Sequence, residues 1–462
     1  MLDNWAFPIK LESEVAAIIA QQQINGVGFD KDRAEQYADT LLNARRSQHN
    51  ELNKFFGYVT EDKDRTCARP FKPDGTYAEK VKKLLKGEDM PIAGPFTHIE
   101  MNPGSRQFVI KKLLEAGWKP APDQYSEQGQ PKLTVKGKPV ESLFSVEGGL
   151  GNALADYYTI QDRLSTIIGW LYAVRDDGRI TATANPLGTP TGRMTHQVVV
   201  NVPGATEKDG ELIWYPDKQD EFFGTEMRSL FCVPQHRWEE GYRFLGYDAS
   251  GLEARIMAHY LNDQKLIDII VDPEGDFHQL IWDAIYDVCS SRGLAKGIEY
   301  ALIYGASDAK LGWMADIKKK GWSDKKLGKY IRRNIMRKLP ALDLLIQKVQ
   351  KEAEQGFVRG LDGRLIRIRS THSALNAKFQ SAGAIVMKVA LVMLMKEATK
   401  RNLDFMKVID MHDEGQNEVH KKDCEEFGNL AVNSIKKAGQ FLGVRCPLDA
   451  EYDVGHNWAM TH

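Results

Sequence analysis

The chain has 462 residues, of which 42% are hydrophobic and 27% charged, and its formal net charge is −1. A chain of this length can bury more than one hydrophobic core, so two or three subdomains are expected, and the composition is that of a soluble globular protein. The balanced charge excludes wholesale basic adhesion to nucleic acid, so any nucleic-acid binding must depend on local patches.

Neither membrane nor disulfide chemistry is indicated by the sequence. No apolar run of 18 residues and no secretory h-region stand out, which predicts a cytosolic protein that does not associate with a membrane. The cysteines are odd in number and form no CxxC pair, so buried free thiols are favoured over a zinc site or a disulfide framework. The five are Cys67, Cys232, Cys289, Cys424 and Cys446.

The first third of the chain is predicted to be rich in helices. These helices are expected over residues 12–23, 30–56, 106–116 and 154–172. Asp30 can cap the second helix, and Ser105 can cap the third. Residues 57–94 are irregular and include a basic run over residues 80–86, and residues 120–147 are turn-rich.

After the first third, the pattern changes to short strands and turns. Residues 179–184 alternate between polar and apolar, and a short apolar strand ends at Asp248, before a helix that begins near Leu252. Residues 263–383 are mostly helical. Within them, residues 318–338 carry ten basic residues against one acidic residue. This run is consistent with a solvated face or with contacts to a nucleic-acid strand or phosphate.

The most informative stretch is a helix whose functional side chains recur every four residues: Arg292, Lys296, Tyr300 and Tyr304, followed by Gly305. Four-residue steps keep side chains on one slowly winding stripe. Two cations one turn apart suit a triphosphate, and two aromatic faces can stack on a base. A solvated charged helix would explain the two cations alone. The tyrosines and the glycine at fixed offsets favour the binding site.

Two acidic motifs flank this helix. Asp248 ends one strand, and Asp413 with Glu414 lies at the tip of another strand. An exposed acidic pair is often ordinary turn chemistry, but an Asp at a strand end can also hold Mg²⁺ together with substrate phosphates. Two Mg²⁺ ions, about 4 Å apart, can stabilise the attacking and leaving oxygens of an in-line displacement.

These blocks resemble the sequence motifs of one enzyme family. Motifs A, B and C of the family A (DNA polymerase I type) DNA polymerases are similar to residues 244–259, 292–305 and 405–414. The Thr191-Gly192-Arg193 block resembles the family's T-G-R motif, whose Arg reads the minor groove. Supporting runs are residues 360–364, 374–384 and 457–462. The resemblance is closest to the replicative polymerases of podovirus-type phages, and it extends from about residue 14 to the last residue.

The resemblance implies an α+β, right-hand polymerase fold. The thumb would be helical and span residues 1–168, including a short N-terminal leader. The palm would contain an antiparallel sheet and be divided between residues 169–261 and 386–462, with helical fingers at residues 262–385. The implied activity is template-directed DNA synthesis, in which dNTPs are added to a primer 3′ end by two-metal-ion nucleotidyl transfer.

The resemblance also implies a role for each matching residue. Asp248, Asp413 and Lys296 would be catalytic, with Lys296 protonating the leaving pyrophosphate. Asp248, Asp413 and the Ala249 carbonyl would hold two Mg²⁺ ions, and Glu414 belongs to the motif without being assigned as a ligand. The dNTP would be bound by His278, Arg292, Lys296, Tyr300, Tyr304 and Glu253. The DNA would be contacted by Arg193, Asn376, Gln380, His412 and Gly305.

Sugar selection follows from Glu253, which occupies the family's steric-gate position. A carboxylate there, held by the Tyr304 hydroxyl, leaves no room for a ribose 2′-hydroxyl and favours deoxynucleotides. The single-subunit phage RNA polymerases, the nearest alternative, carry a small residue at the gate and a large N-terminal promoter domain. A second alternative is a catalytically inactive DNA-binding or clamp protein on the same fold. Retention of Asp248, Asp413 and Lys296 argues against it.

Two departures from the family pattern concern the hairpin and the N-terminus. Residues 415–419 are polar where relatives carry apolar strand residues, so a less firmly packed hairpin is expected. The full-length phage enzymes carry a proofreading exonuclease before the thumb, and here that domain is expected to be absent.

The expected partners are primer-template DNA, dNTPs, and a separate exonuclease chain, helicase or primase. Three roles are open for residues 57–94. They could form a docking site for a thioredoxin-like processivity factor, they could add to the surface that contacts the duplex, or they could be a plain surface loop. The resemblance places the protein in the cytoplasm of a bacterial or phage-infected cell.

Overall fold

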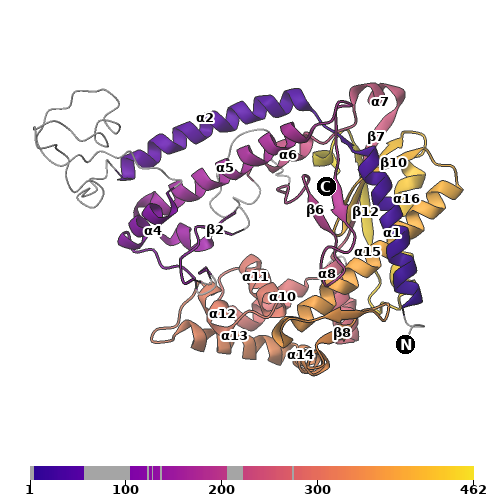
Figure 1. The fold of residues 1–462 in the computed structure, drawn as a ribbon. Helices are drawn as coiled ribbons and strands as arrows, with labels where there is room; N and C mark the ends of the chain where they lie inside the picture. The colour runs from indigo at the N-terminus through magenta and orange to yellow at the C-terminus, as the bar shows by residue number, and fades with distance from the viewer. Residues whose placement is uncertain are drawn as a thin grey trace, which may run out of the picture. The chain divides into compact units, whose positions relative to one another are not determined.

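The computed structural model describes residues 5–56, 105–121, 124–126, 128–135, 138–204, 222–272 and 275–461. The chain forms two compact units, which are described separately (Figure 1). One comprises residues 39–120 and 124–164, and the other the remaining residues. Residues 57–94, where a partner site was expected, lie outside the described residues.

The smaller unit is built from helices and short turns. Its elements are the later part of α2 (Lys31–Phe56), α4 (Arg106–Glu115), β2 (Thr134–Val135), β3 (Lys138–Pro139), the 3₁₀ turns η2 (Glu141–Ser145) and η3 (Glu147–Gly149), and the start of α5 (Leu150–Ala173). Leu113, Leu143 and Leu154 are fully buried in its core. The expectation that Ser105 caps α4 is wrong, because its side chain makes no cap hydrogen bond there. Asp30 does cap α2, since its carboxylate accepts from the Arg33 amide at 3.0 Å.

The larger unit is organised around a four-stranded antiparallel sheet of order β10-β11-β7-β12. Its strands are β7 (Tyr242–Ala249), β10 (Phe405–Met411), β11 (Glu414–His420) and β12 (Ala450–Gly455). The helices α1 (Ala6–Asn25), α15 (Ala374–Lys400) and α16 (Cys424–Phe441) pack on one another and on these strands (Figure 1). Together the two units give the expected α+β fold.

Short elements connect the sheet to the N-terminal residues. They are β1 (Val27–Gly28), β4 (Arg179–Ile180), β5 (Thr183–Asn185), β6 (Thr195–Gln197), α6 (Gly224–Ser229), α7 (Gln235–Glu240) and the 3₁₀ turn η6 (Trp458–Met460). The strand predicted over residues 179–184 is divided in two. A turn bond from the Thr183 amide to the Thr181 carbonyl separates β4, which pairs with β1, from β5, which pairs with β6.

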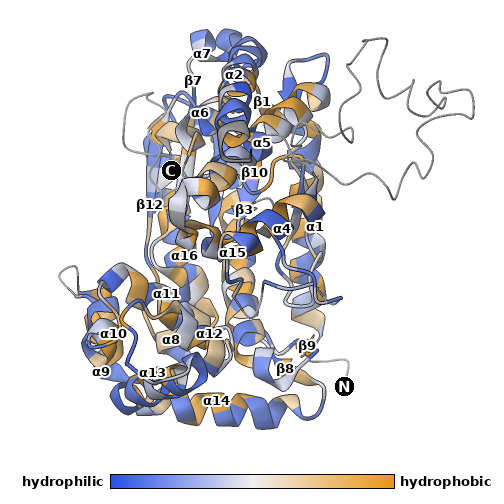
Figure 2. Cartoon of the chain, turned by 90° about the vertical axis from the view of Figure 1, so that its left-hand side faces the viewer, coloured by the Kyte–Doolittle hydropathy of each residue, from blue (hydrophilic) through white to orange (hydrophobic). Residues whose placement is uncertain are grey.

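The helix predicted from Leu252 is α8 (Leu252–Leu261). The segment predicted to be mostly helical, residues 263–383, contains α9 (Gln264–Val271), α10 (Phe277–Ile285), α11 (Arg292–Ile303), α12 (Asp308–Met314), α13 (Asp324–Lys338) and α14 (Pro340–Ala353), then β8 (Phe357–Arg359), β9 (Leu365–Arg367) and the 3₁₀ turn η5 (Thr371–Ser373). Asp or Ser side chains cap α9 to α13, as the helix-start rules predict. Apolar and polar residues interleave along α13 and α14, as expected for helices that pack on one face (Figure 2).

The basic run over residues 318–338 is partly neutralised inside the protein. Lys319 lies 2.7 Å from Asp287, Arg332 lies 2.7 Å from Asp308, and Lys318 lies 3.1 Å from Asp324. These three cations hold α12 and α13 to their surroundings. A contact to nucleic acid therefore depends on the remaining basic residues of the run.

The predictions about the cysteines and about membrane-length apolar segments have different outcomes. The four cysteines in the described part of the chain are buried free thiols, as predicted, and Cys67 lies outside it. By length and composition, residues 371–400 could cross a membrane, which was not anticipated. However, 72% of their most apolar window is buried inside the protein, as in the core helix of a soluble fold.

Candidate active site

The strand register brings the acidic residues of the two motifs together. Asp248 on β7 lies directly opposite Glu414 on β11, and the Ala249 amide donates to the Asp413 carbonyl at 3.1 Å. His412 and Asp413 form the two-residue turn between β10 and β11, with His412 at a φ of 24°. A left-handed residue in so short a turn turns the chain tightly and presents Asp413 at the end of the sheet.

The carboxylates of this end form a negatively charged cluster. The surrounding protein raises the pKa of Asp413, the charges of Glu414 and Glu253 raise it further, and the Arg193 guanidinium lowers it. Within the described ranges, no three His, Cys, Asp or Glu residues are grouped so that they could hold a metal by themselves. The protein therefore offers the Asp248 and Asp413 carboxylates without a full set of protein ligands around them. This arrangement fits Mg²⁺, which is usually bound by one or two carboxylates plus substrate phosphates.

A buried arginine that the sequence analysis missed faces this cluster. Arg228 on α6 has 7% of its surface exposed, and its Nη1 lies 3.9 Å from Oε2 of Glu414. Its Nε donates to the Pro203 carbonyl at 2.7 Å. The available sequence signal was an arginine beside the apolar run of residues 230–233.

Glu253 is held from two sides at the start of α8. The Tyr304 hydroxyl donates to its two carboxylate oxygens at 3.0 and 2.9 Å, and Arg193 Nη2 lies 3.4 Å from Oε1. Burial and the Glu253 charge raise the pKa of Tyr304, so its hydroxyl keeps the proton it donates. Asn376 and Gln380 on α15 line the same small cavity as Glu253 and Tyr304.

The stripe on α11 has the predicted order. Arg292 donates to Asp276 through Nε and Nη2 at 2.5 and 2.8 Å, and Lys296 is exposed one turn later. The Lys296 ammonium lies 6.0 Å from the centre of the Tyr300 ring, and the Tyr300 and Tyr304 rings are also 6.0 Å apart. Burial, with Glu253 and Glu299, raises the pKa of Tyr300 to about 12.

Gly305 ends this helix in the left-handed conformation, with a φ of 80°, as predicted. A Cβ at this position would lie 2.6 Å from the His372 carbonyl oxygen, so a larger residue would also clash. The site therefore requires glycine both for its backbone conformation and for the close approach of η5.

A buried glutamate under the stripe was also missed. Glu299 has 2% of its surface exposed, and its Oε2 lies 2.8 Å from Nδ1 of His278. Burial raises the pKa of Glu299, while His278 and Lys296 lower it. Because the carboxylate accepts from Nδ1–H, the other ring nitrogen of His278 remains available to a ligand. A lone acid among the apolar residues of one helix face was the sequence signal.

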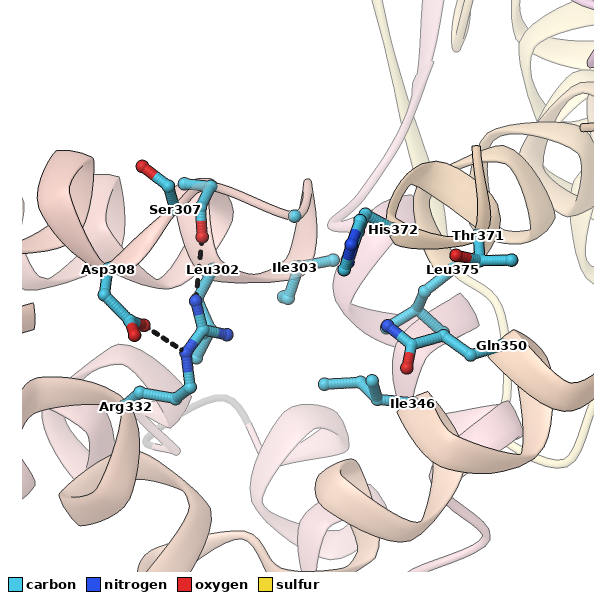
Figure 3. Close-up of a pocket in the computed structure, with 12 residues that line it drawn as sticks. Leu302, Ile303, Ser307, Asp308, Arg332, Ile346, Gln350, Thr371, His372 and Leu375 are labelled. Carbon is cyan, nitrogen blue, oxygen red and sulfur yellow. Dashed lines mark hydrogen bonds and ion pairs between the residues drawn. The ribbon is translucent and has the colours of Figure 1, made fainter. Parts of the chain in front are cut away.

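A pocket of about 450 Å³ adjoins the end of α11. Leu302, Ile303 and Ser307 lie along one part of its wall, with Arg332 bonded to Asp308 at 2.7 Å (Figure 3). The other side of the wall contains Ile346, Gln350, Thr371, His372 and Leu375 (Figure 3). Gly305 also lines this pocket, and it is the lining residue to which the sequence analysis assigned a role at the site.

The remaining predicted DNA contact, His412, packs its ring 5.3 Å from the ring of His196. His196 Nε2 in turn lies 2.8 Å from the Asp410 carbonyl oxygen. The protein environment and the charges of Arg193 and His196 lower the pKa of His412 to about 4, so the imidazole is neutral near pH 7.

The expectation of a loosely packed hairpin is wrong. Gln416, Asn417 and Glu418 on β11 are fully buried. Gln416 accepts from the Thr461 hydroxyl at 2.9 Å, and Glu418 accepts from two arginines, Arg179 and Arg237, at 2.7 Å each. Gln416 and Glu418 are therefore stabilised by partners from distant parts of the sequence, whereas the buried side-chain amide of Asn417 has no hydrogen-bond partner among the described residues.

Comparisons with known proteins identify the family of this chain. The family model described as DNA polymerase family A matches residues 83–460. The DNA-directed DNA polymerase of Escherichia phage Phieco32 is 31% identical over 442 residues, covering 78% of this chain and 68% of the relative. That of Escherichia phage T7 is 28% identical over 520 residues, covering 98% and 70%.

A solved structure shows the same fold. It is the POL domain of Pol1 from M. smegmatis, in complex with DNA primer-template and dNTP, with a TM-score of 0.74 and 20% identity. The similarity covers 97% of this chain and 70% of that one. From the acidic strand ends, the cationic and aromatic helix and the extent of the family match, it follows that this chain belongs to the family A DNA polymerases.

Proposed function

We propose that this polymerase extends a DNA primer on a DNA template, using dNTPs and two Mg²⁺ ions held at Asp248 and Asp413. The observation that carries the proposal is the register of β7 and β11, which sets Asp248 beside the Asp413 turn. Family membership implies a divalent metal in general, and the oxygen-only set of donors favours Mg²⁺. When bound, the ions would lower the barrier by neutralising charge on the attacking and leaving oxygens.

The residues of α11 act on the incoming nucleotide in this proposal. Arg292 and Lys296 are exposed and one turn apart, so they can bind successive phosphates. Arg292 must first exchange its bond to Asp276 for a phosphate. His278, oriented by Glu299, adds a third donor. Lys296 would donate a proton to the leaving pyrophosphate.

The same proposal assigns sugar and template selection to the Glu253 pair. The carboxylate bonded to Tyr304 occupies the space where a ribose 2′-hydroxyl would lie, which favours DNA over RNA synthesis. Tyr304 also ends the helix that borders the 450 Å³ pocket, and we assign the templating strand to this side. Arg193, Asn376, Gln380 and His412 would contact the primer-template, and His412, which is neutral near pH 7, would do so without a charge of its own.

We retain the proposed division into thumb, palm and fingers. Residues 39–120 and 124–164, the smaller compact unit, would form most of the thumb, and α9 to α14 would form the fingers. Binding of a processivity factor at residues 57–94, and the other accessory partners, remain proposals that rest on the resemblance alone.

The test is single-nucleotide extension of a labelled, primed DNA template in Mg²⁺, with dNTPs and rNTPs offered in parallel. We expect rapid addition of the complementary dNTP and little addition of the matching rNTP. Preferential rNTP addition would favour the RNA polymerase alternative. DNA binding without any extension would favour the clamp alternative.

A further inference from the structure

Arg228 is fixed beside the acidic cluster by three contacts. Its Nε donates to the Pro203 carbonyl at 2.7 Å, its guanidinium lies 4.5 Å from the centre of the Trp458 ring, and its Nη1 lies 3.9 Å from Oε2 of Glu414. Only 7% of its surface is exposed. A planar guanidinium held in this way has little freedom to reach another partner.

Glu414 needs a compensating cation at this place. Residues directly opposite each other on antiparallel strands point to the same face with Cβ atoms about 5 Å apart, and like charges there destabilise the sheet. Asp248 and Glu414 form such a pair, and Asp413 follows in the adjoining turn. A buried guanidinium is itself costly unless an acid offsets it. The Arg228 and Glu414 charges therefore offset part of each other's cost of burial.

We infer that Arg228 is a positioning residue, which holds the Glu414 carboxylate against α6 and η6 so that Asp248 and Asp413 alone are presented to the metal ions. The inference rests on the proposed two-metal site and concerns a residue that the site itself does not contain. Without Arg228, Glu414 loses the guanidinium that lies 3.9 Å from its carboxylate, and its side chain can compete as an additional ligand. Metal binding then becomes tighter but less productive.

A matched control exists at the other end of the same strand. Arg179 is also a buried arginine, and it donates to the buried Glu418 of β11 at 2.7 Å. Glu418 lies four residues after Glu414, which is about 13 Å along a strand. Arg179→Met therefore removes another buried arginine–glutamate contact away from the metal site, and Glu418 keeps its second partner, Arg237, at 2.7 Å.

The experiment compares Arg228→Met, Arg228→Lys, Arg179→Met and the double variant Arg228→Met/Glu414→Gln. Mn²⁺ affinity is titrated by electron paramagnetic resonance without nucleotide, and kcat and KM for dNTP are measured separately. For Arg228→Met we expect tighter Mn²⁺ binding, with kcat lowered about 10–100-fold and KM little changed. Arg228→Lys, which keeps the charge, should bind Mn²⁺ like the wild type but with a reduced kcat.

The controls separate this role from a loss of stability. The added Glu414→Gln change should return Mn²⁺ affinity to the wild-type value, and Arg179→Met should alter the melting temperature but not Mn²⁺ affinity. Unchanged or weaker Mn²⁺ binding by Arg228→Met would overturn the inference. If Arg228→Met does not fold, an unchanged kcat in Arg228→Lys would overturn the inference instead. Asp413→Ala tests the underlying site: if it still binds Mn²⁺ and extends primers, the two-metal proposal itself fails.

Discussion

The two halves of the candidate site are held in place in different ways. At the end of the sheet, backbone pairing places the acidic residues: Asp248 lies opposite Glu414, and the Ala249 amide bonds to the Asp413 carbonyl. On α11, an exchangeable side-chain contact holds Arg292, which is bonded to Asp276, and Lys296 is exposed. The metal end is therefore organised before substrate arrives, whereas the nucleotide end must exchange partners to bind it.

The strongest test of this difference removes a carboxylate from the sheet end. Asp248→Ala or Asp413→Ala should lower incorporation by more than about a hundredfold, because one remaining aspartate cannot hold both metal ions in the catalytic arrangement. Primer-template affinity should stay within about tenfold, because phosphate contacts elsewhere dominate it. Rapid-quench incorporation and filter binding measure the two quantities. Incorporation by either variant at more than about one hundredth of the wild-type rate would contradict the assignment of these two aspartates as metal ligands.

The corresponding change on α11 is Arg292→Ala. Losing hydrogen bonds to a charged phosphate costs about 1.5–3 kcal/mol, so kcat/KM for dNTP should fall about 10–100-fold. Lys10→Ala, which changes an exposed lysine on α1, serves as the control and should leave kcat/KM nearly unchanged. Equal effects of the two changes would show that Arg292 makes no specific phosphate contact.

Discrimination between sugars should depend on the hydrogen bond that joins the two halves. Glu253→Ala removes the group that occupies the 2′-hydroxyl position, so the ratio of dNTP to rNTP incorporation should fall strongly. Tyr304→Phe keeps Glu253 but removes its donor at 2.9 and 3.0 Å, so a smaller fall is expected. Competition assays with both nucleotide types measure the ratio. A larger effect of Tyr304→Phe than of Glu253→Ala would contradict the gate.

Tyr300 should determine the response to dideoxynucleotides. Its hydroxyl can replace the 3′-hydroxyl of the nucleotide near the β-phosphate, so the wild-type enzyme should accept chain terminators almost as well as dNTPs. Tyr300→Phe should restore discrimination by about 10–100-fold, the value of one bond to a charged group. Termination assays on a primed template measure it. Equal termination by the wild type and Tyr300→Phe would show that the Tyr300 hydroxyl does not lie near the 3′ position of the incoming nucleotide.

The smallest expected effect concerns His412 and pH. Its folded-state pKa of about 4 lies below the usual 6.5, so the unfolded chain binds the proton more readily. The His412 contribution to stability is therefore complete above pH 6.5 and is lost as the pH falls from 6.5 through 4. His412→Gln should show a slightly smaller decrease in melting temperature over that interval. An NMR titration giving an imidazole pKa near 6.5 would refute the premise.

Local sequence patterns predicted much of the scaffold correctly. The strand before Asp248, the helix from Leu252 and the stripe that ends at Gly305 were expected and are present. Each depends on neighbours within one or two turns of the chain: alternation in a strand, caps at helix starts, and a glycine where the backbone becomes left-handed. The family resemblance could be recognised because such motifs keep their spacing.

Only the tertiary structure determined which residues far apart in the sequence pair with one another. No local pattern states that Asp248 faces Glu414, that Arg228 approaches the same carboxylate, or that Glu299 orients His278. Glu418 shows why, because it seemed to weaken its strand yet bonds to Arg179, 239 residues away. A buried charge is tolerated only when a partner offsets its desolvation, and that partner is supplied by the fold.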